Sequence, residues 1–209
     1  MGRIKSFVLE HDGLFKYQKA KVVHLHDIFL SKTFLKLIPA SVTPNQVTFF
    51  RVLATPVVFL IILYGNYTVG IALFVFAAFT DAVDGAMART QNKITKFGML
   101  FDPLADKFLI GSMILILVFQ NFNVWLGIAI LGLEIIFIVL SALTLRKSKF
   151  KTELMANLWG KIKMILQVLA VCVTLLALAF NIPYLFTIAA GVFGLAIGFA
   201  LISLFTHGI

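Results

Sequence analysis

Six long apolar runs dominate this chain and restrict what it can fold into. They cover approximately residues 47–64, 68–88, 103–120, 123–145, 159–180 and 183–205. Each is close to the roughly 20 apolar residues that one helix needs to cross the hydrocarbon core of a bilayer. Backbone groups in that environment have no water to bond, so each run is predicted to be a helix. The sequence therefore predicts an all-α integral membrane protein with six transmembrane helices.

The composition and the breaks between the runs support this interpretation. Hydrophobic residues make up 61% and charged residues 13% of the chain, whereas soluble domains are about 45–50% apolar and about 25% charged. The breaks contain turn residues, namely GNYT at 65–68, QNFN at 120–123 and NIP at 181–183. Cys172 is the single cysteine, so no disulfide framework is predicted.

The positions of the 18 lysines and arginines predict the orientation. Eight lie within residues 1–51, four within 89–107 and six within 146–163. With six spans, all of them fall on one side of the membrane or just inside it. The positive-inside rule makes that side cytoplasmic, with both termini on it. The net charge of +9 therefore indicates topology and attraction to anionic lipid headgroups, and no nucleic-acid binding is predicted.

The predicted domains are a cytoplasmic N-terminal segment, residues 1–44, and a six-helix domain, residues 45–209. No apolar core long enough for a signal peptide occurs near the start of the chain. The stretch DIFLSKTFLKLI, residues 27–38, keeps most of its apolar residues apart from its two lysines. This pattern predicts a short amphipathic helix on the membrane surface, ended by Pro39. Residues 1–26 read equally well as a plain linker.

Four of the nine acidic residues lie in one stretch of the chain, residues 80–107. Asp81 and Asp84 are three residues apart at the end of the second apolar run, and Asp102 and Asp106 are four apart. Each pair therefore shares one helix face, with Asp102 suited to cap the third helix. A short loop joins the two runs, so the two acidic faces are predicted to meet near the inner surface of the membrane.

Four carboxylates at close quarters need compensation. They could share protons, bind divalent cations or pair with the nearby bases Arg89, Lys93, Lys96 and Lys107. Mg²⁺ and Mn²⁺ prefer oxygen ligands, and two such ions suit displacement at phosphorus. Gly85 and Gly98 leave room for a flat ligand to approach the backbone, and the Arg89 guanidinium suits a bidentate contact with phosphate. A salt-bridged loop without chemistry is the alternative.

The spacing of these residues resembles the signature of the CDP-alcohol phosphatidyltransferases, D-x2-D-G-x2-A-R-x8-G-x3-D-x3-D. Every defined position is matched, by Asp81, Asp84, Gly85, Ala88, Arg89, Gly98, Asp102 and Asp106. The six-helix prediction also agrees with the fold of that family. The resemblance implies an enzyme of phospholipid biosynthesis that transfers a phosphatidyl group from CDP-diacylglycerol to a hydroxyl acceptor and releases CMP.

The resemblance also implies roles for individual residues. The four aspartates would hold two divalent ions, Mg²⁺ or Mn²⁺, and Asp106 would be the catalytic base. A close-fitting cytidine pocket would be formed by Gly85, Ala88 and Gly98. Arg89 and Thr95 would contact the nucleotide phosphates. The segment PNQVT at residues 44–48 resembles the start of the family's first helix, which makes Asn45 and Thr48 predicted neighbours of the CDP group.

The acceptor is predicted from a closer resemblance. TPNQVTFFR, FDPLADK and GKIK resemble the bacterial phosphatidylglycerophosphate synthase branch, whose acceptor is glycerol 3-phosphate. That branch carries an Arg-Glu pair in the fourth span, where this chain has Leu133 and Glu134. Other acceptors, inositol phosphate among them, therefore stay open. The residues considered for acceptor binding are Arg51, Lys107, Glu134, Arg146, Lys161 and Lys163.

A small ion or metabolite transporter is the alternative from another functional class. It would be expected to show paired broken helices and paired polar residues at mid-membrane depth. This chain shows Glu134 alone and no paired repeat. The prediction is therefore a multi-pass enzyme of the cell (inner) membrane with its active site on the cytoplasmic side. The family resemblance adds a homodimer, for which Gly194 and Gly198 form a small-xxx-small pattern.

Overall fold

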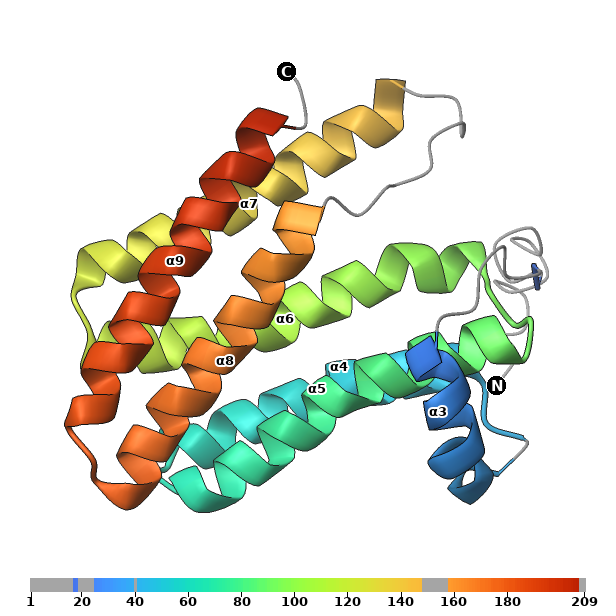
Figure 1. The fold of residues 1–209 in the computed structure, drawn as a ribbon, viewed down its shortest axis with the longest axis horizontal. Helices are drawn as coiled ribbons and strands as arrows, with labels where there is room; N and C mark the ends of the chain where they lie inside the picture. The colour runs from blue at the N-terminus through green and yellow to red at the C-terminus, as the bar shows by residue number, and fades with distance from the viewer. Residues whose placement is uncertain (1–16, 19–24, 40, 148–157, 207–209) are drawn as a thin grey trace, which may run out of the picture. The chain divides into compact units, whose positions relative to one another are not determined.

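The computed structural model describes residues 17–18, 25–39, 41–147 and 158–206 (Figure 1). The elements described are, in chain order, α3 (Leu25–Thr33), the 3-10 helix η1 (Leu35–Leu37), α4 (Pro44–Leu63), α5 (Tyr67–Thr90), α6 (Lys96–Asn121), α7 (Val124–Lys147), α8 (Leu158–Phe180) and α9 (Tyr184–Thr206). Each of the six apolar runs corresponds to one helix, from α4 to α9. The prediction of an all-helical chain is confirmed for the described residues.

The predicted breaks coincide with residues that leave the helical conformation. Gly65 follows α4 with a φ of 81°, and Asn181 follows α8 with a φ of 56°. Both values lie in the left-handed region, which glycine and asparagine adopt most readily at helix ends. The QNFN break separates α6, which ends at Asn121, from α7, which begins at Val124.

Four of the described helices are long and apolar enough to cross a membrane. They are Pro44–Leu63, Tyr67–Thr90, Trp159–Phe180 and Tyr184–Phe205. Large apolar side chains such as Phe49, Leu53 and Phe76 remain exposed along them. So much exposed apolar surface is unfavourable in water and suits lipid. The fold is that of a membrane protein.

The start of α6 differs from the sequence prediction. Asp102 was expected to cap a helix beginning at Pro103, but α6 begins at Lys96 and contains Pro103. The cap is Thr95, whose Oγ1 accepts a hydrogen bond of 2.9 Å from the backbone N–H of Gly98. The missing N–H of Pro103 removes a single helical hydrogen bond, which the longer helix tolerates. The carboxylate of Asp102 is therefore inside the helix and available to neighbouring elements.

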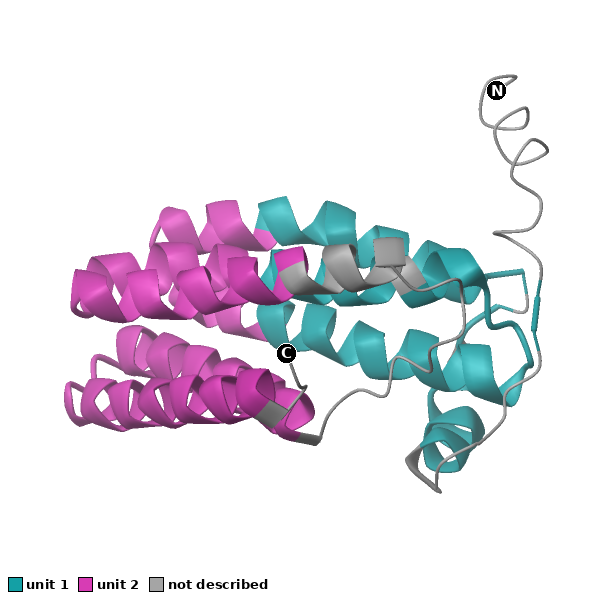
Figure 2. Cartoon of the chain, turned by 90° about the horizontal axis from the view of Figure 1, so that it is seen from above, with its two compact units in different colours: residues 1–57, 73–109 teal, residues 58–72, 110–209 magenta. Residues whose placement is uncertain are grey.

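The chain divides into two compact units (Figure 2). Unit 1 comprises Met1–Val57 and Leu73–Leu109. In it the predicted N-terminal helix appears as α3 followed by η1. Leu35 of η1 packs against Val83 and Met87 of α5, and the rings of Phe34 and Phe79 meet edge to face at 4.9 Å. These contacts seat the N-terminal helical segment on α5.

Unit 2 comprises Val58–Ala72 and Ile110–Ile209. Its last two helices, α8 and α9, pack along one another, as the orange and red ribbons of Figure 1 show. Trp159 and Phe199 stack at a centroid distance of 5.7 Å. Phe122, after the end of α6, meets Phe193 of α9 edge to face at 5.9 Å.

Candidate functional site

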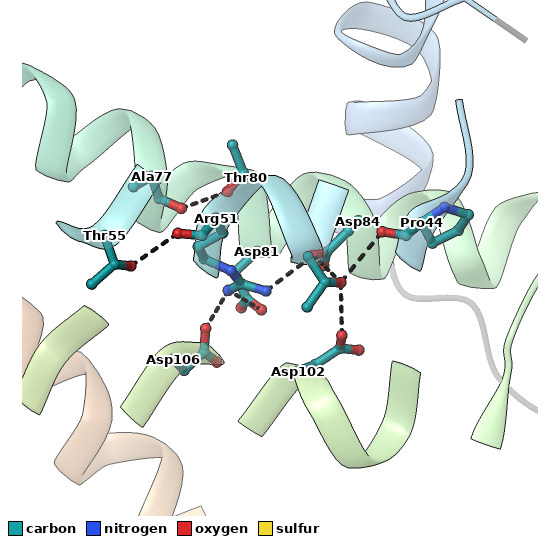
Figure 3. A network of polar contacts seen from close by, with 10 residues as sticks. Pro44, Arg51, Thr55, Ala77, Thr80, Asp81, Asp84, Asp102 and Asp106 are labelled. Atoms are coloured by element: carbon teal, nitrogen blue, oxygen red, sulfur yellow. Dashed lines mark hydrogen bonds and ion pairs between the residues drawn. The ribbon is translucent and has the colours of Figure 1, made fainter. Parts of the chain in front are cut away.

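A buried arginine joins three of the four predicted aspartates in unit 1. Nη1 of Arg51, on α4, lies 2.7 Å from Oδ1 of Asp81 and also contacts the carboxylate of Asp106. Nη2 lies 3.0 Å from Oδ2 of Asp84. Figure 3 shows the guanidinium pointing between Asp81 and Asp84 on α5 and Asp106 on α6. The Arg51 side chain is completely buried.

The hydroxyl of Thr48 brings the fourth aspartate into the same cluster. Its Oγ1 lies 3.0 Å from Oδ2 of Asp84 and 2.8 Å from Oδ1 of Asp102. It also lies 3.3 Å from the carbonyl oxygen of Pro44. A hydroxyl carries one proton and donates to one of these oxygens at a time. The acidic faces of α5 and α6 therefore come together, as the sequence predicted, and two side chains of α4, Thr48 and Arg51, contact both of them.

The acidic cluster, which we define as Asp81, Asp84, Asp102 and Asp106, surrounds the guanidinium of Arg51. One guanidinium balances one of its four carboxylates. Oδ1 of Asp84 is buried and has no hydrogen-bond partner in the described part of the chain, which is costly for an acceptor removed from water. The Asp81 side chain is 44% exposed, so the cluster has an open side.

The acidic cluster is arranged around Arg51 in this structure. Within the described residues, no group of three or more His, Cys, Asp or Glu side chains has the arrangement to hold a metal ion. The donor set nevertheless suits a hard cation, because it consists of carboxylate and hydroxyl oxygens and includes the unpartnered Asp84 oxygen.

The sequence predicted that the four aspartates would come together, but it did not predict that Arg51 would lie among them. Thr48, Arg51 and Thr55 follow one another at helical spacing and are all buried, whereas Phe49 and Leu53 on the same helix are exposed. Oγ1 of Thr55 donates a 2.9 Å hydrogen bond to the carbonyl oxygen of Arg51. A polar stripe along an otherwise apolar helix was the signal available, because it marks the face that turns away from lipid.

Three residues predicted to contact the nucleotide lie together where the start of α6 meets the start of α4. Oγ1 of Thr95 donates a 2.9 Å hydrogen bond to Oδ1 of Asn45 and accepts the N–H of Gly98. A Cβ added to Gly98 would lie 3.0 Å from Oδ1 of Asn45 and 3.2 Å from Oγ1 of Thr95. A side chain at this position would crowd both partners, so the site favours glycine here.

Arg89, the predicted phosphate contact, pairs with a residue that sequence reasoning missed. Its Nε donates to Oδ2 of Asp27 at 2.8 Å, and its Nη2 donates to Oδ1 at 2.7 Å. Asp27 lies on α3 and is completely buried. Ala88 precedes Arg89 on α5 and is half-buried, and Lys107, also half-buried, follows Asp106 on α6.

Unit 2 holds a second polar group, which includes two candidates for acceptor binding, Glu134 and Lys163. Oε1 of Glu134, on α7, accepts hydrogen bonds from Nζ of Lys163 at 2.5 Å and from Nε2 of Gln167 at 2.9 Å, both on α8. Nζ of Lys163 also lies 4.7 Å from the centroid of the Phe137 ring. Glu134 thus pairs with Lys163, a lysine of the GKIK segment. Lys161 is exposed.

Arg146, the remaining candidate for acceptor binding, falls near the end of α7. Its side chain lies outside the part of the chain that the structure describes.

The ion pair between Glu134 and Lys163 leads to a prediction about the stability of the protein. Glu134→Gln should lower the free energy of unfolding by about 1–3 kcal/mol, because Lys163 would remain buried without its counter-charge. The measurement is chemical unfolding of the purified protein in detergent micelles. The double variant Glu134→Gln/Lys163→Met should recover much of this loss, and a double variant less stable than the single one would contradict the pairing argument.

Comparison with known proteins gives the same family as the signature. A family model described as CDP-alcohol phosphatidyltransferase matches residues 41–206. A Bacillus subtilis protein named CDP-diacylglycerol--glycerol-3-phosphate 3-phosphatidyltransferase is 34% identical over 157 residues, which are 68% of this chain and 78% of that protein. A Rickettsia felis protein of the same name is 44% identical over 77 residues, 35% of this chain and 42% of that protein.

A relative that is named for a different activity also matches. A Drosophila melanogaster protein named probable cardiolipin synthase (CMP-forming) is 38% identical over 79 residues, 37% of this chain and 24% of that protein. The family match covers most of the chain, and the Bacillus subtilis relative aligns over most of its own length. The chain belongs to the CDP-alcohol phosphatidyltransferase family, as the signature predicted.

Proposed function

We propose that this member of the CDP-alcohol phosphatidyltransferase family transfers the phosphatidyl group of CDP-diacylglycerol to glycerol 3-phosphate and releases CMP. The likeness over 157 residues to a relative named for that reaction carries the proposal. Leu133, which stands where the glycerophosphate branch has arginine, keeps inositol phosphate as the alternative acceptor. Membership of a transferase family leaves the transporter hypothesis without support.

We propose that the acidic cluster holds two divalent ions, Mg²⁺ or Mn²⁺. Three features support this: the gathering of four carboxylates around one guanidinium, the hard oxygen donors, and Oδ1 of Asp84, which has no hydrogen-bond partner among the described residues. Bound ions of this kind supply positive charge to the diphosphate and to the departing CMP. With that charge present, Arg51 would be less strongly held by the aspartates, and its guanidinium could bind the phosphate of the acceptor.

Asp106 is proposed as the catalytic base. It takes the proton of the acceptor hydroxyl, and the freed oxygen forms a bond to the phosphorus that carries the diacylglycerol. The bond from that phosphorus to the oxygen of CMP breaks, and CMP leaves with its electron pair. The Asp106 side chain is 16% exposed, so its carboxylate is accessible to a small acceptor.

The CDP-lipid contacts are proposed from the family signature. They are Asn45, Thr48, Gly85, Ala88, Arg89, Thr95 and Gly98. The hydroxyl of Thr95 already bonds Asn45 and the backbone of Gly98. A phosphate contact by Thr95 therefore has to replace its bond to Asn45. Acceptor binding is proposed on the same basis for five further residues: Lys107, Glu134, Arg146, Lys161 and Lys163.

The proposed membrane arrangement has six spans, α4 to α9, with both termini and the active site on the cytoplasmic side of the inner membrane. α3 and η1 would lie on that surface, where the exposed Ile28, Phe29 and Phe34 could enter the lipid headgroup region. A homodimer is proposed from the family, with Gly194 and Gly198 on α9 free of side-chain neighbours within 4 Å of an added Cβ.

The proposed reaction is tested with purified protein, CDP-diacylglycerol and Mn²⁺ or Mg²⁺, with CMP release followed for a panel of acceptors. We expect metal-dependent release with glycerol 3-phosphate and background release with inositol 1-phosphate. Mass spectrometry of the lipid product identifies the acceptor that was transferred. Release with inositol 1-phosphate alone would contradict the glycerol 3-phosphate proposal and would give Leu133 a role in acceptor choice.

A further inference from the structure

An ion pair outside the family signature links the N-terminal helix to the nucleotide side of the site. Both carboxylate oxygens of Asp27 accept hydrogen bonds from Arg89, at 2.8 Å from Nε and 2.7 Å from Nη2. Asp27 has no exposed side-chain surface, and Arg89 is 31% exposed. A two-point contact of this kind fixes the plane of the guanidinium as well as its position.

The contact with Asp27 determines which edge of the guanidinium stays available. A guanidinium has five N–H donors, and Asp27 takes the one on Nε and one on Nη2. The other edge, formed by Nη1 and Nη2, lies near Gly85: a Cβ added there would be 3.2 Å and 3.1 Å from these two atoms. The donors of Arg89 that Asp27 does not take are therefore held beside Gly85, a residue of the family signature that has no side chain.

Independent contacts hold Asp27 in place. Phe34 packs on Phe79, and Leu35 packs on Val83 and Met87. Earlier in the chain, the backbone N–H of Gln18 donates a 2.7 Å hydrogen bond to the carbonyl oxygen of Ile94, directly before Thr95. The packing of Phe34 and Leu35 on α5 thus holds α3 and η1 in place, so that the Asp27 carboxylate has a fixed position beside Arg89.

The need to attach α3 to the rest of unit 1 does not by itself explain why the contact between Asp27 and Arg89 is a buried ion pair. Two apolar side chains of similar size would attach the helix as well or better, because burying charges carries a desolvation cost that their attraction only partly offsets. What an apolar pair could not do is orient a guanidinium. The buried carboxylate is therefore better explained by its effect on Arg89 than by its contribution to stability.

We infer that Asp27 is a positioning residue for CDP-lipid binding: it holds Arg89 so that the remaining Nη1 and Nη2 donors face a phosphate of the nucleotide. This inference rests on the proposed role of Arg89 as a phosphate contact. It extends the site beyond the matched family region, which begins at residue 41, to the N-terminal helix.

The test is a direct measurement of the dissociation constant for CDP-diacylglycerol in detergent micelles with Mn²⁺, which needs no acceptor. Asp27→Asn keeps the shape of the side chain but removes its charge, and we expect the dissociation constant to rise by about tenfold, the equivalent of about 1.4 kcal/mol. Asp27→Glu restores the charge on a longer side chain and should give an intermediate value.

Phe34→Ala is the matched control, because it loosens the same docking contact without touching the ion pair. We expect it to lower the melting temperature and to raise the dissociation constant less than Asp27→Asn does, because both members of the ion pair remain. If Phe34→Ala weakens binding as much as Asp27→Asn, docking alone is responsible and the inference is wrong. Tighter binding by Asp27→Asn would also overturn it, because Asp27 would then compete with the phosphate.

The role of Arg89 is tested separately by a double-mutant cycle. Asp27→Asn should have little further effect on binding in an Arg89→Ala background, since its effect passes through the guanidinium. If Arg89→Ala alone leaves the dissociation constant unchanged, the proposed phosphate contact fails whatever Asp27 does. Equal effects of Asp27→Asn with and without Arg89 would overturn the positioning role while leaving the phosphate contact intact.

Discussion

Asp106→Asn is expected to lower kcat by at least about a hundredfold, since a positioned general base contributes about 10²–10⁴-fold. Asparagine has the same shape and still offers an oxygen to Arg51, but it cannot accept the proton of the acceptor hydroxyl. Arg51 also keeps its contacts with Asp81 at 2.7 Å and Asp84 at 3.0 Å. The site should therefore remain assembled, and the affinity for CDP-diacylglycerol should stay near the wild-type value.

Single-turnover CMP release, with binding measured separately, distinguishes the possible roles of Asp106. Leu104→Ala is a suitable control on the same helix, because Leu104 is an exposed apolar residue. Full activity of Asp106→Asn would remove Asp106 as the base. Loss of binding together with activity would instead show that its carboxylate acts mainly in holding the cations and the substrate and not as the base.

Hydropathy predicted the helices well, because burial in lipid requires long apolar runs with internally bonded backbones. The start of α6 was the exception. Residues 96–101 precede a proline and include Lys96, so the pattern favoured a helix beginning at Pro103. Thr95 caps the helix earlier through its bond to the Gly98 N–H. A side-chain cap is a local contact that hydropathy does not report, and it decided the boundary.

The site was predictable where its residues are close in sequence. Spacings of three and four residues put each aspartate pair on one helix face, and the short α5–α6 connection brings the faces together. The position of Arg51 depends on how α4 packs against both helices. Asp27 is 62 residues from Arg89 and follows no local pattern. Such contacts become visible only when the tertiary arrangement is known.

Removal of divalent cations by a chelator is expected to abolish CMP release, and added Mn²⁺ should restore it. The structural reason is that Arg51 balances only part of the acidic cluster and that Oδ1 of Asp84 has no partner in the described residues. A cation that binds the folded protein also stabilises it, by about 2.7 kcal/mol at a hundred times its dissociation constant. Mn²⁺ should therefore raise the melting temperature of the wild-type protein even when no substrate is present.

The variant Asp84→Asn distinguishes two possibilities: an acidic cluster that binds cations, and one that is held together by Arg51 alone. Losing this charge should weaken Mn²⁺ binding, so the rise in melting temperature should need a higher Mn²⁺ concentration than in the wild type. Glu134→Gln is the control, because it removes a carboxylate from unit 2 and should keep the wild-type Mn²⁺ response. The two-cation proposal is wrong if chelation leaves activity intact and Mn²⁺ raises the melting temperature of neither the wild type nor Asp84→Asn. The guanidinium of Arg51 would then be enough to hold the acidic cluster together. If Asp84→Asn alone loses the response, the unpartnered carboxylate oxygen is part of the cation site.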